Sequence, residues 1–139
     1  MRHHILPFVV VFSLLLTACG QQHENRENEE ATNEGAPPKI QFEEVYYDFG
    51  SLKQGEKVSY VFEFKNTGGS ALVIREAIPS CGCTVPRFEK EPVMPGEKGG
   101  VEVIFDSTGR RGNQYKSVIL RTNTPRGDVR LTIKANVVV

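Results

Sequence analysis

Hydrophobic and polar residues alternate along most of the chain after residue 38. In the clearest run, Val58, Tyr60, Phe62 and Phe64 are separated mainly by polar residues. Successive side chains of a strand point to opposite faces of a sheet, so a period of two predicts a strand with one buried and one wet face. No stretch of ten residues has the period of an amphipathic helix.

The same alternation recurs and predicts about seven short strands. They cover residues 40–48, 57–65, 71–78, 83–88, 100–106, 115–122 and 128–137. Gly and Pro cluster between these runs, as expected for turns, because Gly adopts positive φ and Pro fixes φ. Seven strands in about 100 residues are typical of an immunoglobulin-like β-sandwich. We therefore expect an all-β protein with one such domain over residues 39–139.

Residues 1–18 have the pattern of a signal peptide. A short basic start precedes Ile5–Leu16, which is almost wholly apolar. A helix of this length measures about 18 Å, whereas the hydrocarbon core of a bilayer measures about 30 Å. The segment therefore predicts export rather than a transmembrane anchor.

The signal peptide ends in Leu16-Thr17-Ala18-Cys19, which resembles the lipobox of bacterial lipoproteins. The resemblance implies that a diacylglycerol is attached to the sulfur of Cys19 and that cleavage falls between Ala18 and Cys19. Several fatty chains, palmitate among them, hold a protein durably on a membrane. We expect a lipid-anchored protein of the cell envelope, in the outer membrane, on its periplasmic face or at the cell surface.

Residues 19–38 predict a disordered acidic tether behind the lipidated cysteine. The stretch from residue 20 holds five Glu against one Arg, with no aromatic or branched aliphatic residue. Such a segment buries too little apolar surface to offset its ordering entropy. An alternative interpretation makes this acidic stretch a signal for export to the outer surface.

The net charge of residues 39–139 is too small to suggest a nucleic-acid partner. Fifteen Lys and Arg stand against twelve Asp and Glu. This weak basic bias gives no indication of a nucleic-acid partner.

Several motifs of the domain fall in the order seen in domain-of-unknown-function family 1573, which the chain therefore resembles. These motifs are Phe49-Gly50, Gly55-Glu56, Phe62-Glu63-Phe64-Lys65-Asn66-Thr67-Gly68, Ser80-Cys81-Gly82-Cys83-Thr84, Pro95-Gly96-Glu97 and Phe105-Asp106-Ser107. The family consists of exported bacterial proteins whose fold is similar to Hydin-type immunoglobulin-like domains. The resemblance implies fold and export, and no settled activity.

The domain offers few residues for catalysis. It contains no His, so Ser/His/Asp or Cys/His catalysis lacks its usual base. It also lacks a paired zinc motif and a calcium loop. Tyr46 and Tyr47 are candidates for stacking on a ligand or for packing. Arg110 and Arg111 indicate a solvated turn, or a grip on a polyanion.

Cys81-Gly82-Cys83 is the strongest candidate for chemistry. Two cysteines at this spacing in an extended strand stand too far apart for a disulfide. We expect Gly82 to adopt positive φ and bring the sulfurs together. Three outcomes are open: a strained, reducible disulfide with a redox role, a thiolate pair that holds a soft ion such as Cu(I), with Met94 as a third ligand if it folds near, or a structural feature without chemistry.

Ser107 is a candidate O-glycosylation site. Asp106-Ser107-Thr108 matches a three-residue acceptor pattern of some anaerobic Gram-negative bacteria, although a Ser after a strand is also ordinary turn chemistry.

The sequence therefore predicts a non-enzymatic, lipid-anchored binding or scaffold module. Its partner is expected to be another envelope protein or a glycan. The competing hypothesis is a thiol-based redox or copper protein centred on Cys81 and Cys83.

Overall fold

The structure is a computed structural model that describes residues 35–139. All regular elements in this range are strands: β1 (Ile40–Phe42), β2 (Tyr46–Lys53), β3 (Lys57–Asn66), β4 (Ile74–Pro79), β5 (Thr84–Phe88), β6 (Lys98–Asp106), β7 (Gly112–Thr122) and β8 (Asp128–Val138). Across the described range, no helix is long and apolar enough to cross a membrane. The signal peptide, Ala18, Cys19 and the tether up to residue 34 lie outside the described residues, and what we predict for them stays a prediction.

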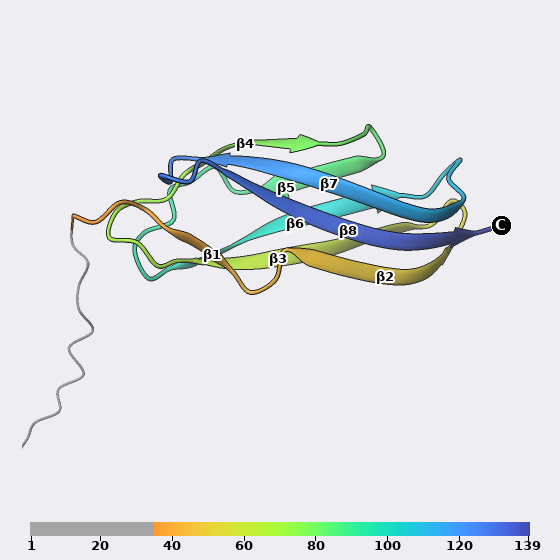
Figure 1. Cartoon of the computed structure of the whole chain (residues 1–139), viewed down its shortest axis with the longest axis horizontal. Helices are drawn as coiled ribbons and strands as arrows, with labels where there is room; N and C mark the ends of the chain where they lie inside the picture. The colour runs from red at the N-terminus through yellow and green to blue at the C-terminus, as the bar shows by residue number, and fades with distance from the viewer. Residues whose placement is uncertain (1–34) are drawn as a thin grey trace, which may run out of the picture. The chain divides into compact units, whose positions relative to one another are not determined.

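The strands form two four-stranded sheets that pack as a sandwich (Figure 1). Sheet A has the order β1-β3-β6-β5 and sheet B the order β2-β8-β7-β4. The β2–β8 ladder is parallel, and the other ladders are antiparallel. The described chain starts at one end of the sandwich and finishes at the other (Figure 1). The prediction of an all-β immunoglobulin-like sandwich is confirmed.

The prediction of one strand over residues 40–48 is wrong, because the chain changes sheets there. Phe42 pairs with Phe64 in sheet A, whereas Tyr46 pairs with Thr132 in sheet B. The alternation shifts phase between the two halves. Even-numbered residues face the core up to residue 42, whereas Tyr47 and Phe49 do so at the start of β2. The crossing therefore adds an eighth strand.

The start of β4 also differs from that of the strand predicted over residues 71–78. The backbone of Leu72 forms only an isolated bridge to Val93, and β4 begins at Ile74. The other predicted strands are confirmed with shifts of at most three residues at their ends.

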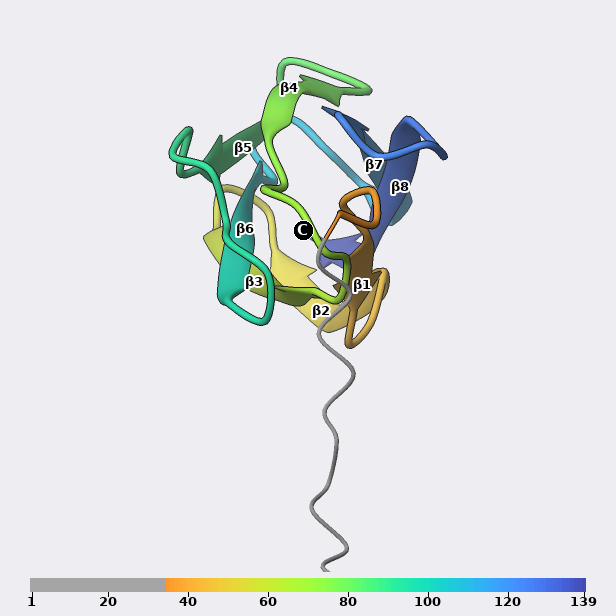
Figure 2. The same ribbon diagram turned by 90° about the vertical axis from the view of Figure 1, so that its left-hand side faces the viewer.

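The core lies between the sheets and follows the predicted alternation. In β3, Phe62 and Phe64 are buried while Val61 and Glu63 are exposed. Both sheets contribute fully buried side chains, among them Phe62, Phe105, Leu120 and Leu131, and Leu72 before β4 is fully buried as well. Figure 2 looks along the sandwich from the end where the described chain begins and shows the strands surrounding this core.

Asn66 organises the end of the sandwich where the described chain begins. The side chain is fully buried, and its Nδ2 donates to the carbonyl oxygens of Ser70 and Val93 at 2.9 Å. Its Oδ1 accepts from the backbone N–H of Gly68 at 3.0 Å and of Lys39 at 3.4 Å. Asn66 thus joins the β3–β4 turn to the entering chain.

The β3–β4 turn also holds the segment just before Lys39. The Ser70 hydroxyl donates to the carbonyl oxygen of Ala36 at 3.0 Å. A Cβ added to Gly68 would lie 2.3 Å from the carbonyl oxygen of Pro37, so only glycine permits this close approach. The folded domain therefore begins before Lys39, and residues 36–38 do not belong to the predicted disordered tether.

Candidate functional site

Cys81 and Cys83 form a disulfide in the turn between β4 and β5, with an S–S distance of 2.09 Å and a Cα–Cα distance of 5.3 Å. The prediction that Gly82 adopts positive φ is wrong, because Gly82 is not among the glycines with that conformation. A Cβ at Gly82 would meet no atom within 4 Å. The turn therefore brings the sulfurs together without a left-handed residue.

The disulfide is partly covered by the end of the sandwich. Cys83 is buried at 8% exposure, and Cys81 is half-buried. The Sγ of Cys81 lies 3.5 Å from the Thr84 hydroxyl oxygen, and the Cys83 carbonyl oxygen accepts from the Asp106 N–H at 3.0 Å. Bonded sulfurs are not thiolate ligands, so Cu(I) binding requires reduction first and stays a prediction.

The structure does not bring Met94 to the cysteine pair. Cys83 lies beside the end of β6, where its neighbour Thr84 pairs with Phe105. Met94 precedes the start of β6, and its N–H donates to Glu97. The length of β6 separates the two places by about 27 Å, given about 3.3 Å per residue. The idea of Met94 as a third ligand is therefore wrong for this fold.

Ser107 is fully buried rather than exposed at a turn. Its Oγ lies 3.0 Å from the carbonyl oxygen of Lys53 and 2.8 Å from that of Glu56. The hydroxyl thus ties the β6–β7 turn to the β2–β3 turn. Glycosylation of Ser107 stays a prediction, and it requires attachment before this part of the chain folds.

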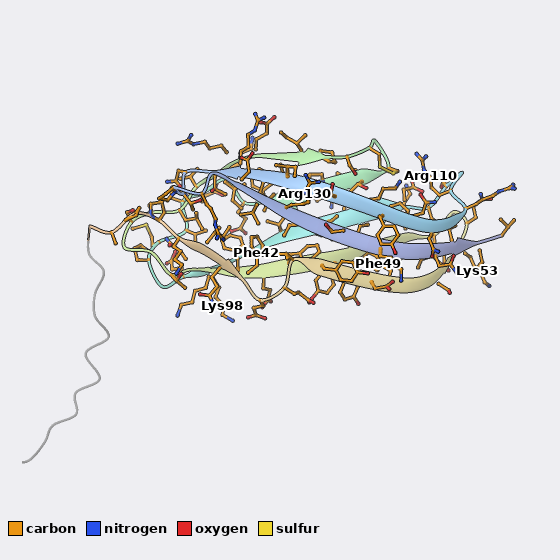
Figure 3. All side chains as sticks on the ribbon, in the orientation of Figure 1. Phe42, Phe49, Lys53, Lys98, Arg110 and Arg130 are labelled. Atoms are coloured by element: carbon orange, nitrogen blue, oxygen red, sulfur yellow. A yellow bond between two sulfur atoms is a disulfide. The ribbon has the colours of Figure 1, made fainter. Side chains whose placement is uncertain are left out.

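The two tyrosines singled out from the sequence have different roles. Tyr47 faces inward and stacks on Tyr60, with ring centroids 3.6 Å apart. Tyr46 points outward from sheet B and is 46% exposed. Arg110 and Arg111 are exposed in the turn between β6 and β7, as predicted, and Figure 3 shows Arg110 at the end opposite Lys98.

Tyr46 belongs to a surface on the outer side of sheet B that we call the tyrosine face. Tyr46 pairs with Thr132 on β8, and Tyr115 of β7 pairs with Lys134, two residues further along β8. Tyr115 is 60% exposed. Two strand spacings and two residues place the Cα atoms of the tyrosines about 12 Å apart. The tyrosine face consists of Tyr46, Asp48, Tyr115, Ser117, Arg130, Thr132 and Lys134.

Lys134 lies at the centre of the tyrosine face and is paired. Its Nζ donates to Asp48 at 2.8 Å. This hydrogen bond raises the pKa of Lys134 and lowers the pKa of Asp48. The phenols of Tyr115 and Tyr46 also raise the pKa of Lys134, to a smaller extent.

Arg130 supplies the cation of the tyrosine face that no carboxylate neutralises. Its guanidinium donates to the Ser117 hydroxyl at 3.1 Å. Among residues 35–139, Arg130 makes none of the ion pairs within 4.0 Å. Its side chain stands on the β7–β8 side of the molecule (Figure 3). The face therefore combines two aromatic rings, hydroxyl groups and an available positive charge.

Sequence reasoning missed most of the tyrosine face. Only Tyr46 was a candidate, whereas Tyr115, Arg130 and Lys134 looked like ordinary exposed strand residues. Their assembly depends on the parallel pairing of β2 with β8, which joins residues more than 80 positions apart.

An open groove of about 810 Å³ lies at the end where the described chain begins. It is lined mainly by apolar side chains, including Pro38, Ile40, Phe42, Val45, Pro125 and Val129.

The fold and the outward residues define an immunoglobulin-like β-sandwich with one aromatic and basic sheet face. A protein of unknown function from Porphyromonas gingivalis is similar at 16% identity and a TM-score of 0.62, over 80% of this chain and 51% of that one. The VesB protease of Vibrio cholerae is similar at 19% identity and a TM-score of 0.55, over 74% and 32%. Human CEP192, in its PapD-like domain 7, is similar at 12% identity and a TM-score of 0.57, over 73% and 87%.

These likenesses show the fold alone, and the chain spans about half the length of the P. gingivalis protein. The chain belongs to the family described as Protein of unknown function (DUF1573), whose model matches residues 40–137. The family predicted from the sequence is thereby confirmed. No curated protein matches the chain.

Proposed function

We propose that this protein is a non-enzymatic binding module, anchored in the outer membrane by lipid on Cys19, that holds an envelope partner with the tyrosine face. The observation that carries the proposal is the pair of outward tyrosines, 46% and 60% exposed, beside an Arg without a carboxylate partner. Tyrosine, with an apolar ring and a polar tip, is enriched at binding interfaces.

The position of the tyrosine face suits a tethered module. The described chain begins at one end of the sandwich, whereas the face lies along the flank formed by β2, β7 and β8 (Figure 1). A partner that binds the flank leaves free the end where the described chain begins. The contacts of Asn66 and Gly68 in the β3–β4 turn hold the start of the described chain against the domain.

The binding half of the proposal is tested by photo-crosslinking in growing cells. A benzophenone amino acid replaces Tyr115 in one strain and Val61, which is 48% exposed on the outer side of sheet A, in the matched control. We expect an adduct from position 115 and none from position 61. Adducts of equal yield at both positions, or none at either, would contradict the proposal.

The anchoring half is tested by the Cys19→Ser change. Without the thiol no lipid is attached, so the chain should leave the outer-membrane fraction or remain an uncleaved precursor. A Cys19→Ser protein that is still acylated in the membrane fraction would rule out the lipobox interpretation.

The disulfide supports a second candidate function, a thiol redox site. Cys81 and Cys83 are bonded to each other in a turn, and Cys81 keeps part of its surface open to solvent. A thiolate of an exchange partner would attack one sulfur and leave the other as thiolate. A redox titration of the purified protein tests this candidate, because structural disulfides of secreted proteins usually have reduction potentials below about −300 mV and reducible ones lie above that value. A reduction potential below about −300 mV, with no Cu(I) retained by the reduced protein, removes this candidate.

A further inference from the structure

We infer that the partner of the tyrosine face is an anionic polysaccharide, a polymer of pyranose rings that carry carboxylates. The inference rests on the proposed binding function and names its ligand class. It is drawn from three features of sheet B: the spacing of the rings, the hydrogen-bonding groups between them and the distribution of charge.

The two tyrosine rings offer two stacking places on one flat surface. Tyr46 and Tyr115 stand on the outer strands of the β2–β8–β7 trio, about 12 Å apart at their Cα atoms. The C–H groups of a pyranose face pack against an aromatic ring, and the phenol tip remains free for a hydrogen bond. A chain of sugars is long enough to touch both rings, whereas one small ligand is not.

The surface between the rings is polar. Thr132 lies on β8 beside Tyr46 and pairs with Ser117, which is two residues from Tyr115 on β7, and the Lys134–Asp48 ion pair lies in the row of Tyr115. The Ser117 hydroxyl accepts from Arg130 and has its own hydrogen left to donate. Hydroxyl groups between aromatic rings suit the many hydroxyls of a sugar, and they offer nothing to an acyl chain of a membrane.

Charge selects an anionic chain. The strands of sheet B carry six Lys and Arg against three acidic residues, a net charge of +3, whereas those of sheet A carry four against three, a net charge of +1. Arg130, free of carboxylates, presents the planar donor pair that binds a carboxylate in two-point fashion. Arg126 and Arg110 extend the positive charge at the turns on either end of β7.

The test measures binding of the full chain, purified in a nonionic detergent, to alginate oligosaccharides, which are chains of uronic acids. Dextran oligosaccharides are the neutral probe, and vesicles with anionic phospholipid are the membrane probe. The variants are Arg130→Gln, Tyr115→Ala and, as the matched control on sheet A, Arg87→Gln, whose ion pair with Glu102 is at 4.0 Å.

We expect the wild-type chain to bind alginate and not dextran. Arg130→Gln and Tyr115→Ala should each weaken alginate binding about tenfold or more, and Arg87→Gln should leave it unchanged. Alginate binding that falls only with Arg130→Gln would reflect charge alone and would overturn the inference. Binding to anionic vesicles that depends on the same residues would overturn it in favour of a membrane surface.

The crosslinking and alginate results together distinguish a failure of the glycan inference from a failure of the proposed binding function. A protein adduct at position 115, together with no alginate binding, would overturn the glycan inference and leave the binding module standing. No adduct of any kind and no alginate binding would overturn both. Far-UV circular dichroism of each variant confirms that a loss of binding does not come from a loss of fold.

Discussion

The two sheets present the same kind of face to the core and different faces to solvent. Inside, Phe62 of sheet A and Leu131 of sheet B are both buried to within 1% exposure. Outside, sheet A carries Val61 and Val85, each about half exposed, together with ion pairs such as Lys57–Asp106. Sheet B carries the two exposed tyrosines and Arg130.

This difference shows where the function of such a domain is specified. The inward positions are fixed by packing and would serve any sandwich of this size. The outward positions are free of that constraint, so two exposed tyrosines beside an Arg without a carboxylate partner, all on sheet B, point to a use. The predictions below test the contrast between inward and outward positions and then between the sheets.

The largest effect is expected at inward positions of either sheet. Phe62→Ala and Leu131→Ala remove fully buried side chains and should lower the free energy of unfolding by about 2–5 kcal/mol. The outward neighbours, Val61→Ala and Thr132→Ala, should change it by about 0.5 kcal/mol. Urea denaturation measures all four. Equal losses at Phe62 and Val61 would contradict the inward and outward assignment.

A smaller effect is expected where the entering chain meets the β3–β4 turn. In Gly68→Ala the new Cβ would overlap the Pro37 carbonyl, so the turn or residues 36–39 must shift, at a cost of about 1–3 kcal/mol. Hydrogen exchange at the Thr67 N–H, which donates to the Lys39 carbonyl, should accelerate.

Gly82→Ala is the matched control for the change at Gly68. Its Cβ meets no atom within 4 Å, and its backbone is not left-handed, so stability and exchange should stay as in the wild type. If Gly68→Ala proved as harmless as Gly82→Ala, residues 36–39 would not be held against the turn as described.

The disulfide between Cys81 and Cys83 should contribute little to the free energy of unfolding. It closes a loop of three residues, which removes little entropy from the unfolded chain, so the double change to Ser at Cys81 and Cys83 should cost less than about 2 kcal/mol. Ser80, next to Cys81, exchanges hydrogen bonds with Ser117 of the tyrosine face, but neither bond involves a sulfur, so binding at the face should not change. Thermal unfolding and alginate binding of the double variant measure both. Loss of the fold would show that the bond is an essential cross-link.

The smallest expected effect is on the stability of the fold at low pH. Hydrogen bonds from Thr108, together with Lys57, lower the pKa of Asp106 on sheet A to about 2. The unfolded chain binds that proton near pH 4, so the stabilisation is complete above pH 4 and is lost as the pH falls toward 2. Asp106→Asn should flatten the dependence of stability on pH in this window. Parallel curves for wild type and variant between pH 4 and 2 would contradict the assignment.

Much of the fold was predictable because burial sets a period of two in the sequence. Phe62 and Phe64 reveal β3 directly. The crossing between β1 and β2 was missed because residues 40–48 read as one run. The phase shift between Phe42 and Tyr47 was the available signal.

The candidate site was less predictable because its members meet only through long-range pairing. Tyr46, Tyr115 and Arg130 come from three strands, and local pattern does not set the register between β2 and β8. Burial of Ser107 likewise depends on the distant carbonyls of Lys53 and Glu56, so the sequence showed only an ordinary turn.

The central claim is that the outer face of sheet B is occupied in the cell and that of sheet A is not. Hydroxyl-radical footprinting tests it without knowledge of the partner, by comparing side-chain oxidation in isolated envelopes with that in the purified chain. The account predicts that Tyr46 and Tyr115 are protected in the envelope while Val61 and Val85, of similar exposure, are oxidised equally in both samples. Unprotected tyrosines, or protection at Val61 and Val85 instead, would contradict it.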